Sequence, residues 1–463
     1  MATHITMISF PQSHTRAKCG IKMHPHRQLL WNSGVQYQPH VSSRHVASAG
    51  CSNQIVVGWP EEEYPDSKES IYNRSDDTKT DVLGLGQAMV DFGASVENSW
   101  LEKHGVAKGS RSLISVQERT SILEGIDEYH IAAGGSLSNT LIDLARLARA
   151  NSTGPEAEFK VAMAGLVGSD ALGSYYRSQM KSAGVSVIAP QEENVHTGTV
   201  IVLTTDDAQR TMLSYLGTQK EVEISKELEQ AISNTSILVI EGYLWELPNA
   251  SKTILQAIRV AKEHGVQIAM TAGDAGVVDR NSEAMWESIH AGVDILFTNA
   301  DEAASLARNR PISNDGSIIK ESISPVTSKA EAAALCLAPF CPMVCVTDGS
   351  VGSVIASLGQ MWVIPPHWTQ SPPVDTCGAG DAWAAGMLFG LLSGGDIVSM
   401  GHVASRSASA VIAKHGPTLC PEAAASVMPQ KSRTNVVSSS GLKAMKNDQI
   451  YVTDSETLGD FSA

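Results

Sequence analysis

Short apolar segments alternate with longer segments of helical periodicity between about residues 81 and 420, and this alternation constrains the fold more than any other feature. The apolar segments are nearly uniform rather than alternately polar, which is typical of strands covered on both faces. The pattern predicts a doubly wound α/β fold, in which helices flank a mostly parallel sheet. The expected strands cover residues 81–85, 161–164, 199–204, 237–241, 267–270, 295–298 and 343–347. The expected helices cover residues 138–150, 173–182, 225–233, 251–264, 301–307, 328–337, 380–392 and 403–414.

One segment departs from this alternation. Residues 196–216 predict two strands joined by a Thr-Asp-Asp-Ala turn, which is a hairpin signal. A hairpin attached to an α/β body often forms a lid over a binding site. We therefore expect a small β-hairpin lid on the sheet-and-helix body.

Residues 1–60 differ in composition from the rest of the chain. They contain no Asp or Glu, they are rich in Ser and Thr, and their Lys and Arg residues are Arg16, Lys18, Lys22, Arg27 and Arg44. This composition is typical of an organelle transit peptide, and the segment lacks the apolar core of a secretory signal. We expect a disordered chloroplast transit peptide, with a mitochondrial one as the alternative.

Two further segments offer little to a folded core. Residues 61–80 are polar and charged, so they are predicted to form an acidic linker. Residues 428–463 are rich in Ser, Asn and Asp and are predicted to form a polar C-terminal tail. The folded domain is therefore expected to cover residues 81–427.

Charge and composition exclude several classes of protein. The formal net charge of −15 disfavours nucleic-acid binding through a broad basic surface. No apolar run approaches the roughly 18 residues of a membrane-spanning helix. The seven cysteines are odd in number and include no C-x-x-C pair, so no disulfide framework is expected. These features predict no direct nucleic-acid partner and no membrane partner.

The strongest chemical signal is the segment Asp375-Thr-Cys-Gly-Ala-Gly-Asp381, which precedes a predicted helix. Its glycines let the backbone turn tightly and approach a ligand closely. The helix start that follows is an anion-binding site, because unpaired N–H groups and the positive end of the helix dipole point outward there. A carboxylate beside such a site is suited to taking a proton from a hydroxyl that attacks phosphorus. Asp381 equally fits a structural aspartate at a helix N-terminus.

Two more glycine-containing segments precede the first long helix. Residues 133–140 read AGGSLSNT, where Asn139 on a first helical turn could bind sugar hydroxyls or simply belong to a helix cap. In residues 84–91, GLGQAMVD, a strand is expected to end in glycines before Asp91. Met89 occupies the third glycine position of a dinucleotide fingerprint, which argues against an oxidoreductase. The chain has no G-x-x-x-x-G-K-[ST] motif, so it is not a P-loop kinase.

The order and spacing of these segments resemble the PfkB, or ribokinase-like, family of sugar and nucleoside kinases. The signature segments are AGGSLSNT and DTCGAGD, and the resemblance extends over about residues 81–420. Residues 165–185, 197–218 and 346–353 and the sequence Asn299-x-x-Glu302 match as well. The resemblance implies a ribokinase-like fold and is strongest to the adenosine-kinase-like branch.

The resemblance also implies roles for individual residues in the transfer step. Asp381 would be the catalytic base that activates the acceptor hydroxyl. The backbone N–H groups of Gly378, Ala379 and Gly380 would stabilise charge on the phosphoryl group that is transferred. These four residues are the predicted catalytic set.

Acceptor binding and cation binding are implied at other positions. Asp91, Gly135 and Asn139 would bind acceptor hydroxyls, and Arg210 on the predicted lid would reach phosphates or substrate, although a solvated hairpin charge explains Arg210 too. Asp375 would help to hold a monovalent cation such as K⁺, as in some relatives.

The resemblance implies nucleotide-binding roles at two shorter segments. Asn299 and Glu302 would organise Mg²⁺ and the ATP phosphates, largely through water, because Mg²⁺ keeps much of its hydration shell. Thr347, Gly349 and Gly352 would line the ATP pocket. The structural alternatives are a helix cap at residues 299–302 and an ordinary turn at residues 347–352.

Two functional hypotheses follow. The first is an ATP-dependent kinase of a sugar, polyol or nucleoside, because every expected catalytic position is intact. The second is a kinase-fold regulator, since some plastid members of the family act as partners of the transcription machinery. The second reading requires plastid protein partners. A homodimer is compatible with either hypothesis.

Overall fold

The computed structural model describes residues 8–9 and 79–428, apart from 153, 155–157, 190–194, 208, 219–220, 312–327 and 370–371. The predicted transit peptide, linker and tail lie outside the described residues, except for Ile8–Ser9, the end of the linker at residues 79–80, and Met428. Ile8–Ser9 pairs with the edge of the main sheet.

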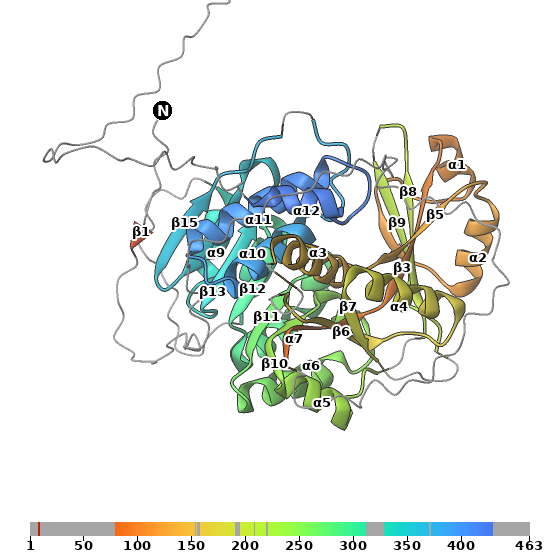
Figure 1. The fold of residues 1–463 in the computed structure, drawn as a ribbon. Coiled ribbons are helices and arrows are strands. Elements are labelled where there is room, and N and C mark those ends of the chain that lie inside the picture. Colours follow the sequence, from red (N-terminus) through yellow and green to blue (C-terminus); the bar gives the residue numbers. More distant parts are fainter. Residues whose placement is uncertain are drawn as a thin grey trace, which may run out of the picture. The chain divides into compact units, whose positions relative to one another are not determined.

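A ten-stranded main sheet forms the centre of the fold, in the order β1-β15-β14-β13-β12-β11-β10-β2-β6-β7 (Figure 1). The run from β13 to β7 is parallel, and β14 and β15 extend it as an antiparallel edge. The strand bounds are β1 Ile8–Ser9, β2 Thr80–Gln87, β6 Val161–Leu166, β7 Val185–Ile188, β10 Thr235–Ile240, β11 Gln267–Thr271, β12 Ile295–Asn299, β13 Met343–Thr347, β14 Ser353–Ser357 and β15 Gln360–Ile364. This arrangement confirms the predicted mostly parallel sheet.

Both faces of the main sheet are buried, and successive strand residues alternate between two cores. Val82 and Val239 belong to one hydrophobic cluster, whereas Leu83 and Leu238 belong to the other. Side chains of a strand point alternately to opposite faces, so a sheet covered on both sides favours apolar residues at consecutive positions. This requirement explains the uniformly apolar strands seen in the sequence.

Two layers of helices cover these faces. Helices α3, α4, α10, α11 and α12 pack on one face, and α5 to α9 pack on the other. The bounds are α3 Ser136–Asn151, α4 Ala171–Ala183, α5 Lys226–Ser233, η2 Gly242–Glu246, α6 Ala250–Glu263, α7 Ala275–Gly292, α8 Ala300–Arg308, α9 Lys329–Leu337, η3 Gly349–Val351, α10 Ala379–Leu392, α11 Ile397–Ile412 and α12 Pro421–Val427. Every predicted helix is present, and α7 is the longest element that the sequence prediction missed.

The lid is larger than the predicted hairpin. Strands β8 and β9 form that hairpin, but they lie within a five-stranded sheet, the lid sheet, in the order β4-β9-β8-β3-β5. Figure 1 shows its strands beside α1 and α2. The bounds are β3 Met89–Ser95, α1 Asn98–Lys103, β4 Arg111–Leu113, α2 Val116–Glu124, β5 His130–Gly134, β8 Gly198–Thr204 and β9 Arg210–Tyr215.

The expectation that the first strand ends in glycines is wrong. Gly84 and Gly86 lie inside β2, which continues to Gln87, and Asp91 lies in β3 of the lid sheet. Glycine is used here for close packing, since a Cβ on Gly86 would lie 2.6 Å from the Glu241 carboxylate. The chain therefore passes from the main sheet into the lid sheet within two residues.

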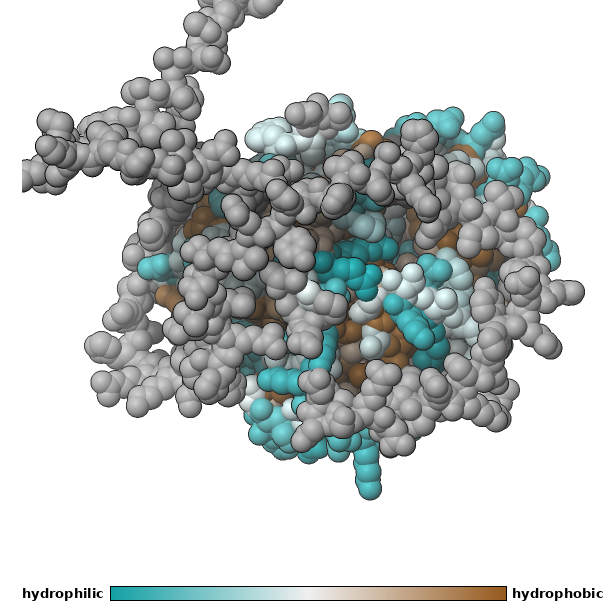
Figure 2. Space-filling model, viewed as in Figure 1, coloured by the Kyte–Doolittle hydropathy of each residue, from teal (hydrophilic) through white to brown (hydrophobic). Residues whose placement is uncertain are grey.

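The surface is mixed in polarity. Figure 2 shows hydrophilic and hydrophobic residues side by side on one face. Among the described residues, no helix is long and apolar enough to cross a membrane. The cysteines within the described part of the chain are free thiols, and Cys341 and Cys345 are buried.

Candidate active site

The segment DTCGAGD lies at the N-terminus of α10. Gly378 is the residue before the helix, with a φ of 73° that favours glycine, and Asp381 lies in the first turn. A Cβ on Gly378 would lie 1.9 Å from the carbonyl oxygen of Pro417, so only glycine fits. We call residues 377–380 the anion loop. Their position at a helix start gives the electrostatic environment that favours an anion.

Asp381 is held by two side chains from α3. Ser136 Oγ donates to one carboxylate oxygen at 2.6 Å, and Asn139 Nδ2 donates to the other at 3.0 Å. Burial raises the pKa of Asp381 to about 6, although both hydrogen bonds act in the opposite direction. The starts of α3 and α10 therefore meet at a carboxylate that is ionised at neutral pH and is a better base than an ordinary aspartate.

Asp91 lies on β3 close to this carboxylate. A Cβ on Gly134 would lie 2.1 Å from the Asp91 carboxylate, so the glycine makes room for it. Burial, followed by the negative charge of Asp381, raises the pKa of Asp91 to about 7. Among the described residues, Asp91 Oδ1 and Asn139 Oδ1 are buried without a hydrogen-bond partner. Two such acceptors require donors, and hydroxyl groups of a ligand are suitable ones.

A cavity of about 150 Å³ opens beside Asp381. It brings together five of the predicted site residues: Asn299, Glu302, Thr347, Gly380 and Asp381. The other lining residues are Ser136, Thr140, Thr271, Ala272, Gly273, Phe297, Thr298, Trp383 and Ala384. The cavity thus joins the start of α10 to the carboxyl ends of β11, β12 and β13, the edge where open α/β sheets bind ligands.

Asn299 and Glu302 both cap α8 and line this cavity. Asn299 Oδ1 accepts from the backbone N–H of Glu302 at 2.9 Å, and Glu302 Oε2 accepts from the N–H of Asn299 at 2.9 Å. The structural alternative weighed from the sequence, a helix cap, is therefore present and leaves both residues in the cavity wall.

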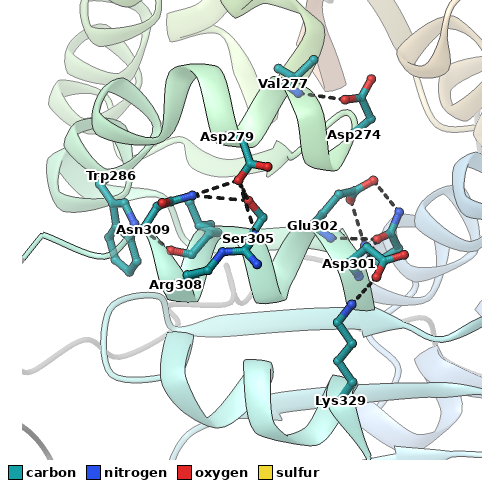
Figure 3. Close-up of polar contacts among 12 residues, drawn as sticks. Asp274, Val277, Asp279, Trp286, Asp301, Glu302, Ser305, Arg308, Asn309 and Lys329 are labelled. Carbon is teal, nitrogen blue, oxygen red and sulfur yellow. Dashed lines mark hydrogen bonds and ion pairs between the residues drawn. The ribbon is translucent and has the colours of Figure 1, made fainter. Parts of the chain in front are cut away.

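Glu302 is suited to binding a cation. Burial, followed by the charges of Asp274 and Asp381, raises its pKa to about 7. Figure 3 shows Asp274 and Glu302 at the starts of α7 and α8. Ser305 and Asn309 at the end of α8 donate hydrogen bonds to Asp279 in α7, and these bonds join the two helices. Within the described ranges no group of three His, Cys, Asp or Glu could hold a metal ion. Mg²⁺ fits this site if phosphates and water supply the remaining ligands.

Besides Gly378 of the anion loop, three predicted glycines do not line the cavity. Gly135 precedes α3 with a φ of 92°, one residue before Ser136. Gly349 and Gly352 form the turn between β13 and β14, where Asp348 N donates to Gly352 O at 2.8 Å. Thr347 lines the cavity together with Asp381, whereas Gly349 and Gly352 do not.

Arg210 and Asp375 form an ion pair that the sequence analysis did not anticipate. Arg210 is the first residue of β9 in the lid sheet, and its guanidinium contacts Asp375 Oδ1. The same oxygen accepts from Cys377 N at 2.7 Å, and Oδ2 accepts from Gly416 N at 3.2 Å. The lid thus contacts the segment that leads into the anion loop.

The sequence matches the pfkB family carbohydrate kinase domain over residues 109–424. The chain belongs to the PfkB family. Its fold is the ribokinase-like α/β fold of sugar and adenosine kinases. The anion loop and Asp381 lie within the matched residues.

Relatives and solved structures agree with this assignment. The chain is 25% identical to guanosine-inosine kinase of Escherichia coli over 237 residues, which cover 49% of this chain and about half (52%) of that protein. It is 24% identical to adenosine kinase of Schizosaccharomyces pombe over 69% of this chain and 92% of that protein. A probable sugar kinase from Rhizobium etli superposes with a TM-score of 0.65 and 27% identity, covering 76% of this chain and 100% of that one. Adenosine kinase from Sinorhizobium meliloti gives a TM-score of 0.62 and 28% identity, covering 75% and 98%.

Sequence reasoning missed several residues of this PfkB site. Ser136 carries no signal of its own beyond its place in the GGS segment. Arg111 on β4 contacts Asp274 and lies 4.0 Å from the centre of the Tyr243 ring, a contact between lid and body that no local pattern encodes. Glu241 was recognisable, because it is a single carboxylate that directly follows the apolar strand β10.

Glu241 follows β10 and hydrogen-bonds to β2 and α3. Its carboxylate accepts from Gln87 N at 2.8 Å and from Leu137 N at 3.2 Å, and burial raises its pKa to about 7.

We expect Glu241→Ala to lower the free energy of unfolding by about 1–3 kcal/mol for each buried N–H left without an acceptor. Denaturant unfolding measures this loss. Glu241→Gln keeps one acceptor oxygen and should lose less, whereas the exposed Glu283→Gln should change little. Equal stability of Glu241→Ala and Glu283→Gln would contradict the assigned role.

Proposed function

We propose that the protein transfers the γ-phosphate of ATP to a hydroxyl group of a sugar or nucleoside. The observation that carries this proposal is the half-buried carboxylate of Asp381 at a helix N-terminus, beside Asp91 Oδ1 and Asn139 Oδ1, two buried acceptor atoms without a hydrogen-bond partner among the described residues. Hydroxyls of the acceptor would donate to those two atoms. A third hydroxyl could then face Asp381.

Asp381 acts as the base in this proposal. As the acceptor oxygen attacks the γ-phosphorus, its proton moves to the Asp381 carboxylate, the new O–P bond forms, and the bond to the β-phosphate oxygen breaks to release ADP. Ser136 and Asn139 hold the carboxylate in position through their hydrogen bonds. The backbone N–H groups of the anion loop stabilise the charge on the phosphoryl oxygens.

The nucleotide would lie along the cavity wall. Asn299, Glu302 and Thr347 lie there beside Gly380, and the turn at Gly349 and Gly352 continues from Thr347. Mg²⁺, when bound with ATP, neutralises phosphate charge and is held mainly by phosphates and water. Glu302 would orient that hydration shell.

A nucleoside is the acceptor that the comparisons favour. Guanosine-inosine kinase and adenosine kinase are among the relatives, and adenosine kinase is among the structural neighbours above 25% identity. A sugar remains the second acceptor class, because a probable sugar kinase is also among those neighbours. Both classes present hydroxyl donors to Asp91 and Asn139.

A separate proposal concerns the cellular compartment in which the protein is located. We propose that residues 1–60 direct it to the chloroplast, on the strength of their acid-free, basic, hydroxyl-rich composition. Fusing this segment to a fluorescent protein tests the proposal, and a mitochondrial signal would replace it. Within the described residues, no observation on the fold or site favours the regulator hypothesis over the kinase.

The proposed activity is tested by ADP release from MgATP with the full chain. Ribose, fructose, fructose phosphates, adenosine, inosine, guanosine and inositol are screened as acceptors. Turnover with one acceptor class establishes the kinase and names that class. A folded protein that binds ATP and turns over none of them would contradict the proposal, and partner capture from plastid extract would become the next experiment.

The pH dependence of turnover provides a second test. Asp381 must be ionised to accept a proton, and its pKa is raised to about 6. The rate should therefore be lost as pH falls through about 6 and be complete well above it, whereas an ordinary aspartate would move the midpoint to about 4. Asp91 and Glu302, each with a pKa raised to about 7, should extend the rise toward neutral pH. A kcat/KM profile that is flat from pH 5 to 8 would argue against Asp381 as the base.

A further inference from the structure

Asp375 links three parts of the molecule at the start of the anion loop. It accepts hydrogen bonds from Cys377 N in that loop and from Gly416 N in the segment before α12. Its third partner is Arg210 of the lid sheet. The loop and the segment are also in direct contact, because Gly378 lies against the carbonyl of Pro417. The position of the anion loop therefore depends on the Asp375 carboxylate.

A carboxylate at this place carries an electrostatic cost. Asp375 and Arg210 are both largely buried, with side chains 13% and 19% exposed. An uncompensated negative charge there would repel the phosphates that the anion loop is built to bind, and burial makes the repulsion stronger. A positive charge beside Asp375 is required for the loop to work as an anion site.

A monovalent cation does not fit the donor set that surrounds Asp375. The family resemblance implies K⁺ at this position, where it would need an oxygen of this carboxylate. Oδ1 is already engaged by a guanidinium and a backbone N–H, and Oδ2 by a second backbone N–H. A cation at the remaining lone pair of Oδ2 would lie beside the guanidinium of Arg210, whose like charge would repel it.

We propose that Arg210 takes the place of the monovalent cation, so that phosphoryl transfer by this protein is independent of K⁺ and depends on the lid arginine instead. Arg210 is a positioning residue in this scheme, since it acts on the transferred group through Asp375 and the anion loop. The proposal deepens the kinase function above and rests on it.

The charge of Arg210 reaches the anion loop itself. Burial raises the pKa of the Cys377 thiol, and the positive charge of Arg210 acts in the opposite direction. Arg210 is also fixed by its place in the sheet, where it pairs with Thr204 of β8 in the hairpin. Lid and anion loop should therefore move together, which a free ion would not require.

The experiment compares salts and variants on the full chain, with the acceptor found in the screen. Wild-type kcat is measured in NaCl, KCl and tetramethylammonium chloride at equal ionic strength, and should agree within about twofold. Arg210→Gln should lose about 10- to 100-fold in kcat, because the anion loop loses its counter-charge. Added K⁺ or guanidinium should restore part of that rate, since the vacated position accepts a cation. Arg210→Lys keeps the charge and should retain most of the rate without added cation.

The controls separate this role from a structural one. Arg119→Gln removes an arginine that lies over Tyr215 within the lid sheet, and its rate should stay unchanged in all salts. Melting temperatures identify any variant that fails to fold, and Arg210→Lys then decides the question. A wild-type rate that K⁺ raises about tenfold would overturn the proposal, as would an Arg210→Gln rate that neither K⁺ nor guanidinium restores.

The role of Arg210 can be tested even if the protein shows no kinase activity. In that case, binding of a fluorescent ATP analogue is titrated in the same three salts. Affinity that is equal in all salts for the wild type, weaker in Arg210→Gln, and strengthened by K⁺ only in the variant supports the role of Arg210. Affinity of the wild type that requires K⁺ contradicts it.

Discussion

Replacing Asp381 by Asn is expected to lower kcat by about a thousandfold, within the range that a general base contributes. Asn keeps the size of the side chain and can still bond to Ser136 and Asn139, but it cannot accept the acceptor proton. The KM for ATP should change little, because Asp381 does not hold the nucleotide in our scheme. Steady-state ADP release with the acceptor from the screen measures both constants.

The stability of this variant distinguishes loss of chemistry from loss of fold. The pKa of Asp381 is raised by burial, so the ionised form destabilises the folded state, and Asn should leave the melting temperature equal or higher. Asp396→Asn is the matched control, because Asp396 also starts a helix, is exposed, and accepts from Ser399 N at 2.8 Å. Asn caps helices about as well as Asp. An Asp381→Asn enzyme with more than about a tenth of wild-type kcat would refute the assigned base.

Replacing Gly378 by Ala is expected to disturb both stability and turnover. The new methyl group would meet the Pro417 carbonyl oxygen at 1.9 Å, backbone against backbone, so the anion loop or the segment behind it must move. We expect a loss of about 2–5 kcal/mol in the free energy of unfolding, typical of overpacking combined with backbone strain. Turnover should fall by about a hundredfold or more, as when an oxyanion donor is displaced.

Gly394→Ala is an unusually close control for this substitution. Gly394 has the same φ of 73° as Gly378, but a Cβ there would meet nothing within 4 Å. Its replacement should cost only about 1 kcal/mol, the strain of a left-handed alanine, and leave turnover unchanged. The difference between the two variants isolates the contact with Pro417. If both lose the same stability, the anion loop has more room than its packing indicates.

The sequence by itself was sufficient for the fold class and for the order of the chemical segments. Strands such as β10 and β12 contain uninterrupted apolar runs, at residues 237–240 and 295–297, because both faces of the main sheet are covered. Such runs can be recognised in the sequence without knowledge of the neighbouring strands. The anion loop is also local: its glycines and the helix that follows are contiguous. Asp381 could therefore be assigned its place at a helix start before any tertiary contact was known.

The lid sheet needed the tertiary structure. Strand β3 contains Gly93 and the polar Asp91, and β4 has three residues, all exposed, so neither shows the pattern of a buried strand. They become strands because β8 and β9 offer them hydrogen-bonding edges, and such pairing is decided by context more than by propensity. The predicted hairpin is present as β8 and β9, and the other strands of the lid sheet were missed for this reason.

The partners of the site residues were also decided by tertiary structure. Arg210 and Asp375 are far apart in the chain, and each alone had a reasonable different partner: a phosphate for the arginine and a cation for the aspartate. The joining of Ser136 and Asn139 to Asp381 likewise depends on α3 packing beside α10. Local sequence sets which groups are available and on which element they lie. Only the packing of distant elements determines which charges meet, because Coulomb energies depend on distance in space and on burial.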